Sequence, residues 1–107
     1  MKTSTHLRKA RALVNKGWCK GRAKMINNKG MQCYCSVGAL AEVNDDNYSD
    51  AWEYLNKQIK NYDPSKDMPK NHGVVVFNDH PSTTKKDVLA VFDLAIKKAV
   101  EDEAQVR

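Results

Sequence analysis

Three cysteines and two late histidines are the residues of this chain whose chemistry could support catalysis. Cys35 directly precedes a predicted helix, and a thiol at a helix N-terminus has a lowered pKa. His80 or His72 could act as its base, and Asp79 or Asn78 could orient that base. This order of residue types would suit a hydrolase or transferase that depends on a cysteine and a histidine.

A zinc site is the second chemical possibility. Cys19, Cys33 and Cys35, together with His72 or His80, supply enough ligands for one ion. Structural zinc sites favour paired Cys-x₂₋₄-Cys knuckles, which a Cys-x-Cys pair and one distant cysteine do not provide. Free cysteines are also among the most buried residues. We therefore expect buried, reduced thiols, with no metal and no other cofactor.

The cysteines belong to a longer pattern: Trp-Cys-x-Gly, a variable loop, Cys-x-x-Gly-Ala-Leu, and later Asn-Asp before a final helix with an early threonine. This pattern resembles that of a family of short uncharacterised proteins of bacteria and their phages, over roughly residues 6 to 99. The matching residues are Trp18, Cys19, Gly21, Cys35, Gly38, Ala39, Leu40, Asn78, Asp79 and Thr84. Phe77, where the family usually has tryptophan, and the additional His80 depart from it. The resemblance implies a phage or prophage setting and no known reaction.

Charge is distributed unevenly along the chain. Residues 1–41 hold nine lysines and arginines and no acid, whereas residues 42–107 hold nine basic residues and all thirteen acids. Such polarity predicts an acidic partner, although pairing between the two halves on one surface would also explain it. The candidate binding residues are Arg8, Lys9, Arg11, Lys20, Arg22 and Lys24.

Composition indicates a single soluble domain. The length of 107 residues allows one modest core. Its apolar runs all fall short of the roughly 20 residues that a membrane-spanning helix needs, and the first residues lack the apolar centre of a signal peptide. We expect reduced thiols, no membrane partner, and a location in the cytoplasm of a bacterial host.

Hydrophobic periodicity predicts most of the helices. One helix is expected over residues 5–16 with Thr5 as its cap, and a short buried helix over residues 36–43. Aromatic and aliphatic residues at helical spacing predict another from Tyr48 to Tyr62. The last is expected to begin near Thr84, with Asp87 three residues on as a capping-box partner. In the short helix, Gly38 would let another backbone approach closely, or would open a ligand site.

The expected fold class is α+β. Residues 18–35 read as a hairpin that turns at Asn27 to Gly30, and Val74 to Phe77 read as a buried strand because they are β-branched and apolar. Together they predict a three-stranded antiparallel sheet on about four helices, in one domain over residues 1–107. We expect an ordered core over about residues 5–100, a long connector at 61–73, and a frayed tail at 101–107.

The sequence favours a small non-catalytic protein of phage type. It would bind a host factor or defence component through the basic N-terminal half, in an anti-defence or host-takeover role. The first alternative is direct binding of nucleic acid or nucleotides, and the second is the Cys/His enzyme described above. Phosphate-loop, HExxH and nucleophile-elbow motifs do not occur in the sequence, and the oligomeric state is left open.

Overall fold

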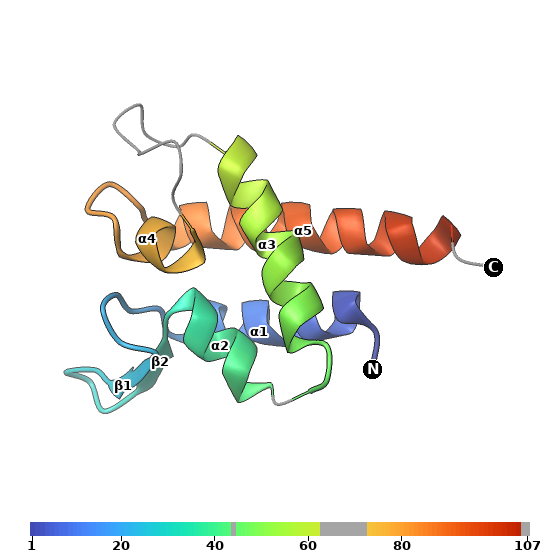
Figure 1. Cartoon of the computed structure of the whole chain (residues 1–107). Coiled ribbons are helices and arrows are strands. Elements are labelled where there is room, and N and C mark those ends of the chain that lie inside the picture. The colour runs from blue at the N-terminus through green and yellow to red at the C-terminus, as the bar shows by residue number, and fades with distance from the viewer. Residues whose placement is uncertain (44, 63–72, 106–107) are drawn as a thin grey trace.

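A computed structural model describes residues 1–43, 45–62 and 73–105. Its elements in chain order are α1 (Thr3–Lys16), β1 (Lys24–Ile26), β2 (Gln32–Tyr34), α2 (Ser36–Glu42), α3 (Tyr48–Asn61), α4 (Val74–Asp79) and α5 (Lys85–Gln105). Helices α1 and α5 pack against each other, and α3 crosses them (Figure 1). The hairpin of β1 and β2 projects at the end of the molecule where α1 stops (Figure 1).

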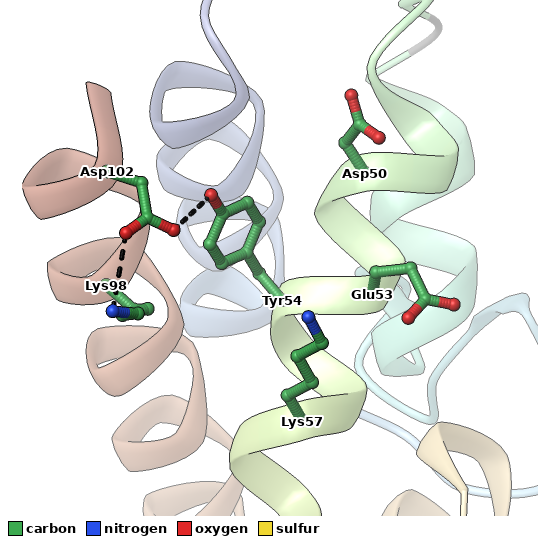
Figure 2. Close-up of a pocket in the computed structure, with 6 residues that line it drawn as sticks. All are labelled: Asp50, Glu53, Tyr54, Lys57, Lys98 and Asp102. Atoms are coloured by element: carbon green, nitrogen blue, oxygen red, sulfur yellow. Dashed lines mark hydrogen bonds and ion pairs between the residues drawn. The ribbon is translucent and has the colours of Figure 1, made fainter. Parts of the chain in front are cut away.

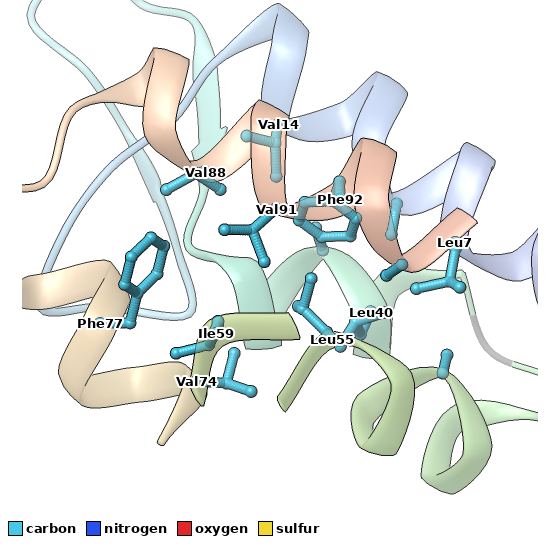
Figure 3. Packing of buried hydrophobic residues seen from close by; sticks show 14 of the residues in the cluster. Leu7, Val14, Leu40, Leu55, Ile59, Val74, Phe77, Val88, Val91 and Phe92 are labelled. Carbon is cyan, nitrogen blue, oxygen red and sulfur yellow. The ribbon is translucent and has the colours of Figure 1, made fainter. Parts of the chain in front are cut away.

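The core lies where these helices meet. Helix α1 contributes Leu7, Ala10 and Val14, which are fully buried because three- and four-residue steps place them on one side of the helix. Aliphatic and aromatic side chains of the other helices complete the cluster in Figure 3, including Leu40, Leu55, Ile59, Val74, Phe77, Val88, Val91 and Phe92. One continuous core therefore joins all five helices.

Helix α1 begins earlier than expected, so Thr5 lies inside the helix and is not its cap. The first turn is instead held by α5, because Glu103 accepts hydrogen bonds from the Ser4 backbone N–H at 3.0 Å and from its hydroxyl at 2.7 Å. This contact also explains why α5 continues to Gln105, beyond the point near residue 100 where we expected the ordered core to end.

The predicted hairpin is present. Strands β1 and β2 pair antiparallel, with Met25 opposite Cys33. The side chain of Asn27 accepts hydrogen bonds from the backbone N–H groups of Lys29 and Met31, at 2.9 and 3.0 Å, and Gly30 has a φ of 75° that favours glycine. The turn residues thus close the hairpin by the chemistry that the sequence predicts.

The third strand was a wrong prediction, because Val74 to Phe77 lie in helix α4. Within this helix Val74, Phe77 and Asn78 are buried, while Val75 and Val76 are 52% and 49% exposed. Spacing of three and four residues thus decides which side chains enter the core, and this packing outweighs the strand preference of the valines. The described residues form five helices and a two-stranded sheet, which keeps the α+β class.

Two further observations complete the fold. Thr84 and Asp87 form the predicted capping box at the start of α5, since the Thr84 N–H donates to the Asp87 carboxylate at 2.9 Å and the Asp87 N–H donates to the Thr84 hydroxyl at 3.2 Å. In the parts of the chain that the structure describes, we find no helix with the length and apolar character that crossing a membrane requires.

Candidate functional site

Asn78 is the centre of the most extensive polar network in the described structure. It is fully buried at the end of α4, and its Oδ1 accepts from the Trp18 indole N–H at 2.8 Å and from the N–H and hydroxyl of Ser36 at 3.0 and 2.8 Å. Its Nδ2 donates to the carbonyl of Cys19 at 3.1 Å and to the Asp79 carboxylate at 3.0 Å. One side chain therefore ties three separate segments together.

Residues next to Asn78 and Trp18 also hold the end of α4 against the loop that follows α1. Asp79 accepts the backbone N–H of Gly21 at 2.9 Å, and Gly21 has a φ of 79°, a conformation that suits glycine. The Lys20 ammonium donates to the carbonyl of His80 at 2.6 Å and lies 5.3 Å from the centre of the Trp18 ring. The Asn-Asp and Trp-Cys-x-Gly motifs therefore meet, and each satisfies the backbone or side-chain groups of the other.

Gly38 makes the close approach that was one of its two predicted uses. A Cβ at this position would lie 1.7 Å from the carbonyl oxygen of Ala23, so only glycine fits without a backbone shift. That same oxygen accepts the N–H of Cys35 at 3.2 Å. The space beside Gly38 is thus occupied by the chain leading into the hairpin, not by a ligand site.

Cys35, His80 and Asp79, the predicted catalytic residues, make capping and turn contacts. The Cys35 sulfur accepts the Gly38 N–H at 3.3 Å as the cap of α2, and the residue is only 8% exposed. His80 Nδ1 accepts the N–H of Ser82 at 3.1 Å, and Asp79 is engaged by Gly21. The described contacts therefore assign these side chains to capping and turns, and they do not join Cys35 to His80.

The surroundings of Cys19 disfavour its thiolate form. Burial raises its pKa to about 12, together with a hydrogen bond to Cys33 and electrostatic interactions with Cys33, Cys35 and Asp79. The Cys19 thiol therefore stays protonated at neutral pH, which is the opposite of what a nucleophile needs. All three cysteines are free in this structure.

The predicted metal ligands are only partly described. Among residues 1–43, 45–62 and 73–105, no group of three or more His, Cys, Asp or Glu side chains is arranged to hold a metal ion. His72, one of the candidate ligands, lies outside the described residues.

The six predicted binding residues divide into two sets. Three are used within the chain: Arg11 Nε lies 2.7 Å from an Asp93 oxygen, Lys24 lies 3.3 Å from Glu42, and Lys20 binds carbonyl oxygens. The ion pairs of Arg11 and Lys24 correspond to the alternative explanation of the charge polarity, in which the two halves of the chain neutralise each other.

The other three, Arg8, Lys9 and Arg22, are exposed. Within the described part of the chain, none of them forms an ion pair. Arg8 borders a surface hollow of about 530 Å³ that Glu103 also lines, and its charge helps to lower the pKa of that carboxyl. The surface cations available to a partner are thus fewer than the sequence suggested.

Exposed apolar residues of the hairpin were not anticipated. Met25, Ile26 and Met31 are 37%, 60% and 51% exposed. Cys33 and Tyr34 of β2 are buried, whereas all of β1 is exposed. Period-two patterning predicts one covered face for each strand, so it could not reveal that β1 lies beyond the helices.

His6 is another residue that sequence reasoning missed. It is fully buried, and its Nε2 lies 2.8 Å from the carbonyl oxygen of Leu40, which requires a proton on Nε2. Its Nδ1 lies 3.9 Å from an Asp45 oxygen. This side chain joins α1 to α2, and nothing in its sequence position distinguishes it from an exposed helical histidine.

A hollow of about 300 Å³ lies between α3 and α5 (Figure 2). The Tyr54 hydroxyl donates to Asp102 at 2.7 Å, and Lys98 pairs with the same carboxylate at 3.3 Å. The hydrogen bond to Asp102, burial and nearby carboxylates raise the pKa of Tyr54 to about 12. Tyr54 therefore remains a hydrogen-bond donor that joins the two helices.

Comparison with known proteins identifies a family model and nothing more specific. The model described as "Family of unknown function (DUF6197)" matches residues 1–98. No curated protein and no solved structure matches the chain.

Proposed function

The chain belongs to this family of unknown function, and we propose that it is a small non-catalytic protein that binds an acidic protein partner. The observation that carries the proposal is the exposure of Arg8 and Lys9 of α1 and of Arg22 just before the hairpin. Because Arg11 and Lys24 are paired internally, we assign recognition to the first three residues and not to all six.

The apolar side chains of the hairpin favour a protein partner over nucleic acid. Ile26 and Met31 are more than half exposed and lie on the same hairpin as Lys24 and close in sequence to Arg22. Protein interfaces combine an apolar centre with a polar rim, whereas nucleic-acid surfaces are dominated by phosphate contacts. Methionine suits such a surface because its flexible side chain adapts to irregular partners.

The proposed setting rests on the resemblance to proteins of bacteria and phages. In that setting the partner would be a bacterial host factor or a component of host defence, and the protein would act in the host cytoplasm. The thiol contacts support the non-catalytic part of the proposal, since Cys35 caps a helix and Cys19 has a raised pKa.

Charge reversal tests the proposal. The variant Arg8→Glu/Lys9→Glu/Arg22→Glu is compared with Lys60→Glu/Lys86→Glu/Lys97→Glu, which changes net charge equally through exposed lysines of the second half. Each tagged protein is used to recover partners from bacterial lysate, and the affinity of any recovered protein is then measured with purified components over a salt series.

We expect a single stoichiometric protein that binds the first variant about tenfold or more weakly than wild type, because lost charge complementarity slows association. The second variant should bind as wild type does. Equal weakening by both variants, or an empty recovery under several conditions, would contradict the proposal.

Nucleic-acid binding is tested alongside. Labelled single-stranded DNA, double-stranded DNA and RNA should show little affinity for the protein at low salt. Tight binding that falls steeply with salt and is lost in the first variant would favour the nucleic-acid alternative instead.

A further inference from the structure

The outer side of helix α3 carries a second surface with the opposite charge character. Tyr48, Ser49, Trp52 and Glu53 line a hollow of about 350 Å³. The two aromatic side chains pack against the core with one part and remain partly exposed with the other. These four residues are called the aromatic–acidic shelf below.

Glu53 supplies the charge of the shelf. It is exposed, and in the described parts of the chain no lysine or arginine forms an ion pair with it. It also lines the neighbouring hollow between α3 and α5, where Figure 2 shows it on the same helix as Asp50 and Lys57. The carboxylate is therefore available to a cation that comes from outside the chain.

Two partly exposed aromatic rings and a carboxylate without an ion pair among the described residues attract the same kind of ligand. A cation over the face of tryptophan or tyrosine is stabilised by the ring electrons, and tryptophan is the most effective ring. A guanidinium group is planar, stacks on such rings, and can also bind a carboxylate. From this combination we propose that the shelf receives an arginine side chain of a partner protein.

The shelf is independent of the basic surface proposed above. A nucleic-acid base could stack on the rings, but Glu53 and the nearby Asp50 would repel its phosphates. Tryptophan and tyrosine are also the side chains that most often anchor protein interfaces. The charge of the shelf thus selects a cationic protein side chain over a nucleotide.

The test uses methylguanidinium as the probe and N-methylurea as its neutral planar counterpart. The full chain is titrated with each at constant ionic strength, and the indole N–H signals are followed by NMR. Trp18 is the internal reference, because its indole N–H is held by Asn78 at 2.8 Å. We expect methylguanidinium to shift the Trp52 signal in a saturable way, with Trp18 unchanged and N-methylurea without effect.

Two matched variants locate the site, and backbone amides of residues 48–53 report on them. Glu53→Gln and Trp52→Leu should each weaken methylguanidinium binding about two- to fivefold, the range expected for one exposed cation–ring contact. Asp50→Asn, next to the shelf but not lining it, should bind as wild type does. Circular dichroism confirms that each variant is folded.

Several results would overturn the assignment. Equal shifts with methylguanidinium and N-methylurea would remove the role of charge. Equal weakening by Asp50→Asn and Glu53→Gln would indicate a general negative field and no defined site. Methylammonium should bind less tightly than methylguanidinium, and tighter binding of methylammonium or tetramethylammonium would exclude an arginine-selective shelf.

Discussion

Removing the side chain of Asn78 should destabilise the protein more than any other single polar change. In Asn78→Ala the buried N–H group of Ser36 and the partly buried indole N–H of Trp18 lose their acceptor, and the carbonyl of Cys19 loses a donor. A buried polar group without a partner costs about 1–3 kcal/mol, and the substitution removes the partner of three such groups at once. We therefore expect a loss of about 3–5 kcal/mol, a large share of the 5–15 kcal/mol typical of a domain.

Urea unfolding followed by tryptophan fluorescence and circular dichroism measures this loss. Asn61→Ala is the matched control, because Asn61 is exposed and its amide makes only a 3.3 Å hydrogen bond to the carbonyl of Lys57 within the same helix. The control should change stability by less than about 0.5 kcal/mol. If Asn78→Ala costs less than about 1 kcal/mol, the network does not hold the three segments together as argued.

The variant Asn78→Asp separates the loss of hydrogen bonds from the loss of volume. The new carboxyl has nearly the same shape and keeps its acceptors, but it is fully buried next to the Asp79 carboxylate. Burial and like charge raise a carboxyl pKa in the folded state, so the variant regains stability relative to wild type as pH falls and the carboxyl becomes protonated. The deficit of Asn78→Ala has no such cause. A pH dependence shared by both variants would refute the assignment.

Three further outcomes are expected. Gly38→Ala should lower the free energy of unfolding by about 3 kcal/mol in thermal or urea unfolding, because its Cβ would lie 1.7 Å from the Ala23 oxygen; stability equal to wild type would show that the two segments can separate freely. Cys19 should react with iodoacetamide far more slowly at pH 8 than a peptide thiol does, because its pKa is raised to about 12, and ordinary rates would contradict its protected state. Partial burial opposes ionisation of Glu103, but hydrogen bonds from Ser4 lower its pKa overall. Its stabilisation is therefore fully present above the usual carboxyl pKa and is lost as pH falls through the lowered pKa of the folded state. Glu103→Gln should flatten this acid limb in pH-dependent unfolding.

Local signals in the sequence predicted those elements whose ends are fixed by their own side chains. The capping box of Thr84 and Asp87 and the turn centred on Asn27 are confirmed because each satisfies backbone groups only two to four residues away. The periodic apolar residues of α3 likewise predicted that helix from Tyr48 onward. No distant contact is needed to decide any of these features.

Helix α4 could not be predicted in the same way. Its valines favour a strand locally, and the alternative requires knowledge that Asn78 must reach Trp18, which lies 60 residues earlier in the sequence. The spacing of Val74, Phe77 and Asn78 was compatible with a helix, but a six-residue segment carries too little periodicity to overrule strand preference. Tertiary contacts with the core and with the Trp18 loop decide this element.

The candidate basic residues show a similar limit. Charge polarity along the chain is visible in the sequence, but the partners of Arg11 and Lys24 lie 82 and 18 residues away. Arg8 and Arg11 occupy the same helix, but only Arg11 lies within ion-pair distance of a carboxylate of α5, that of Asp93. Sequence reasoning could therefore identify a basic half, but not which of its cations remain for a partner.

The same reasoning explains why the sequence motifs that carry the resemblance indicate a fold and no activity. Trp18, Gly21, Asn78 and Asp79 join α4 to the loop that follows α1, and Gly38 lets α2 approach the segment before β1. Side chains used in this way have few groups left for a substrate. The surfaces proposed for recognition, the exposed cations with the hairpin and the aromatic–acidic shelf, lie outside the pattern. A protein could therefore keep the pattern and change its partner, so partner identity has to be sought in the residues that the pattern leaves variable.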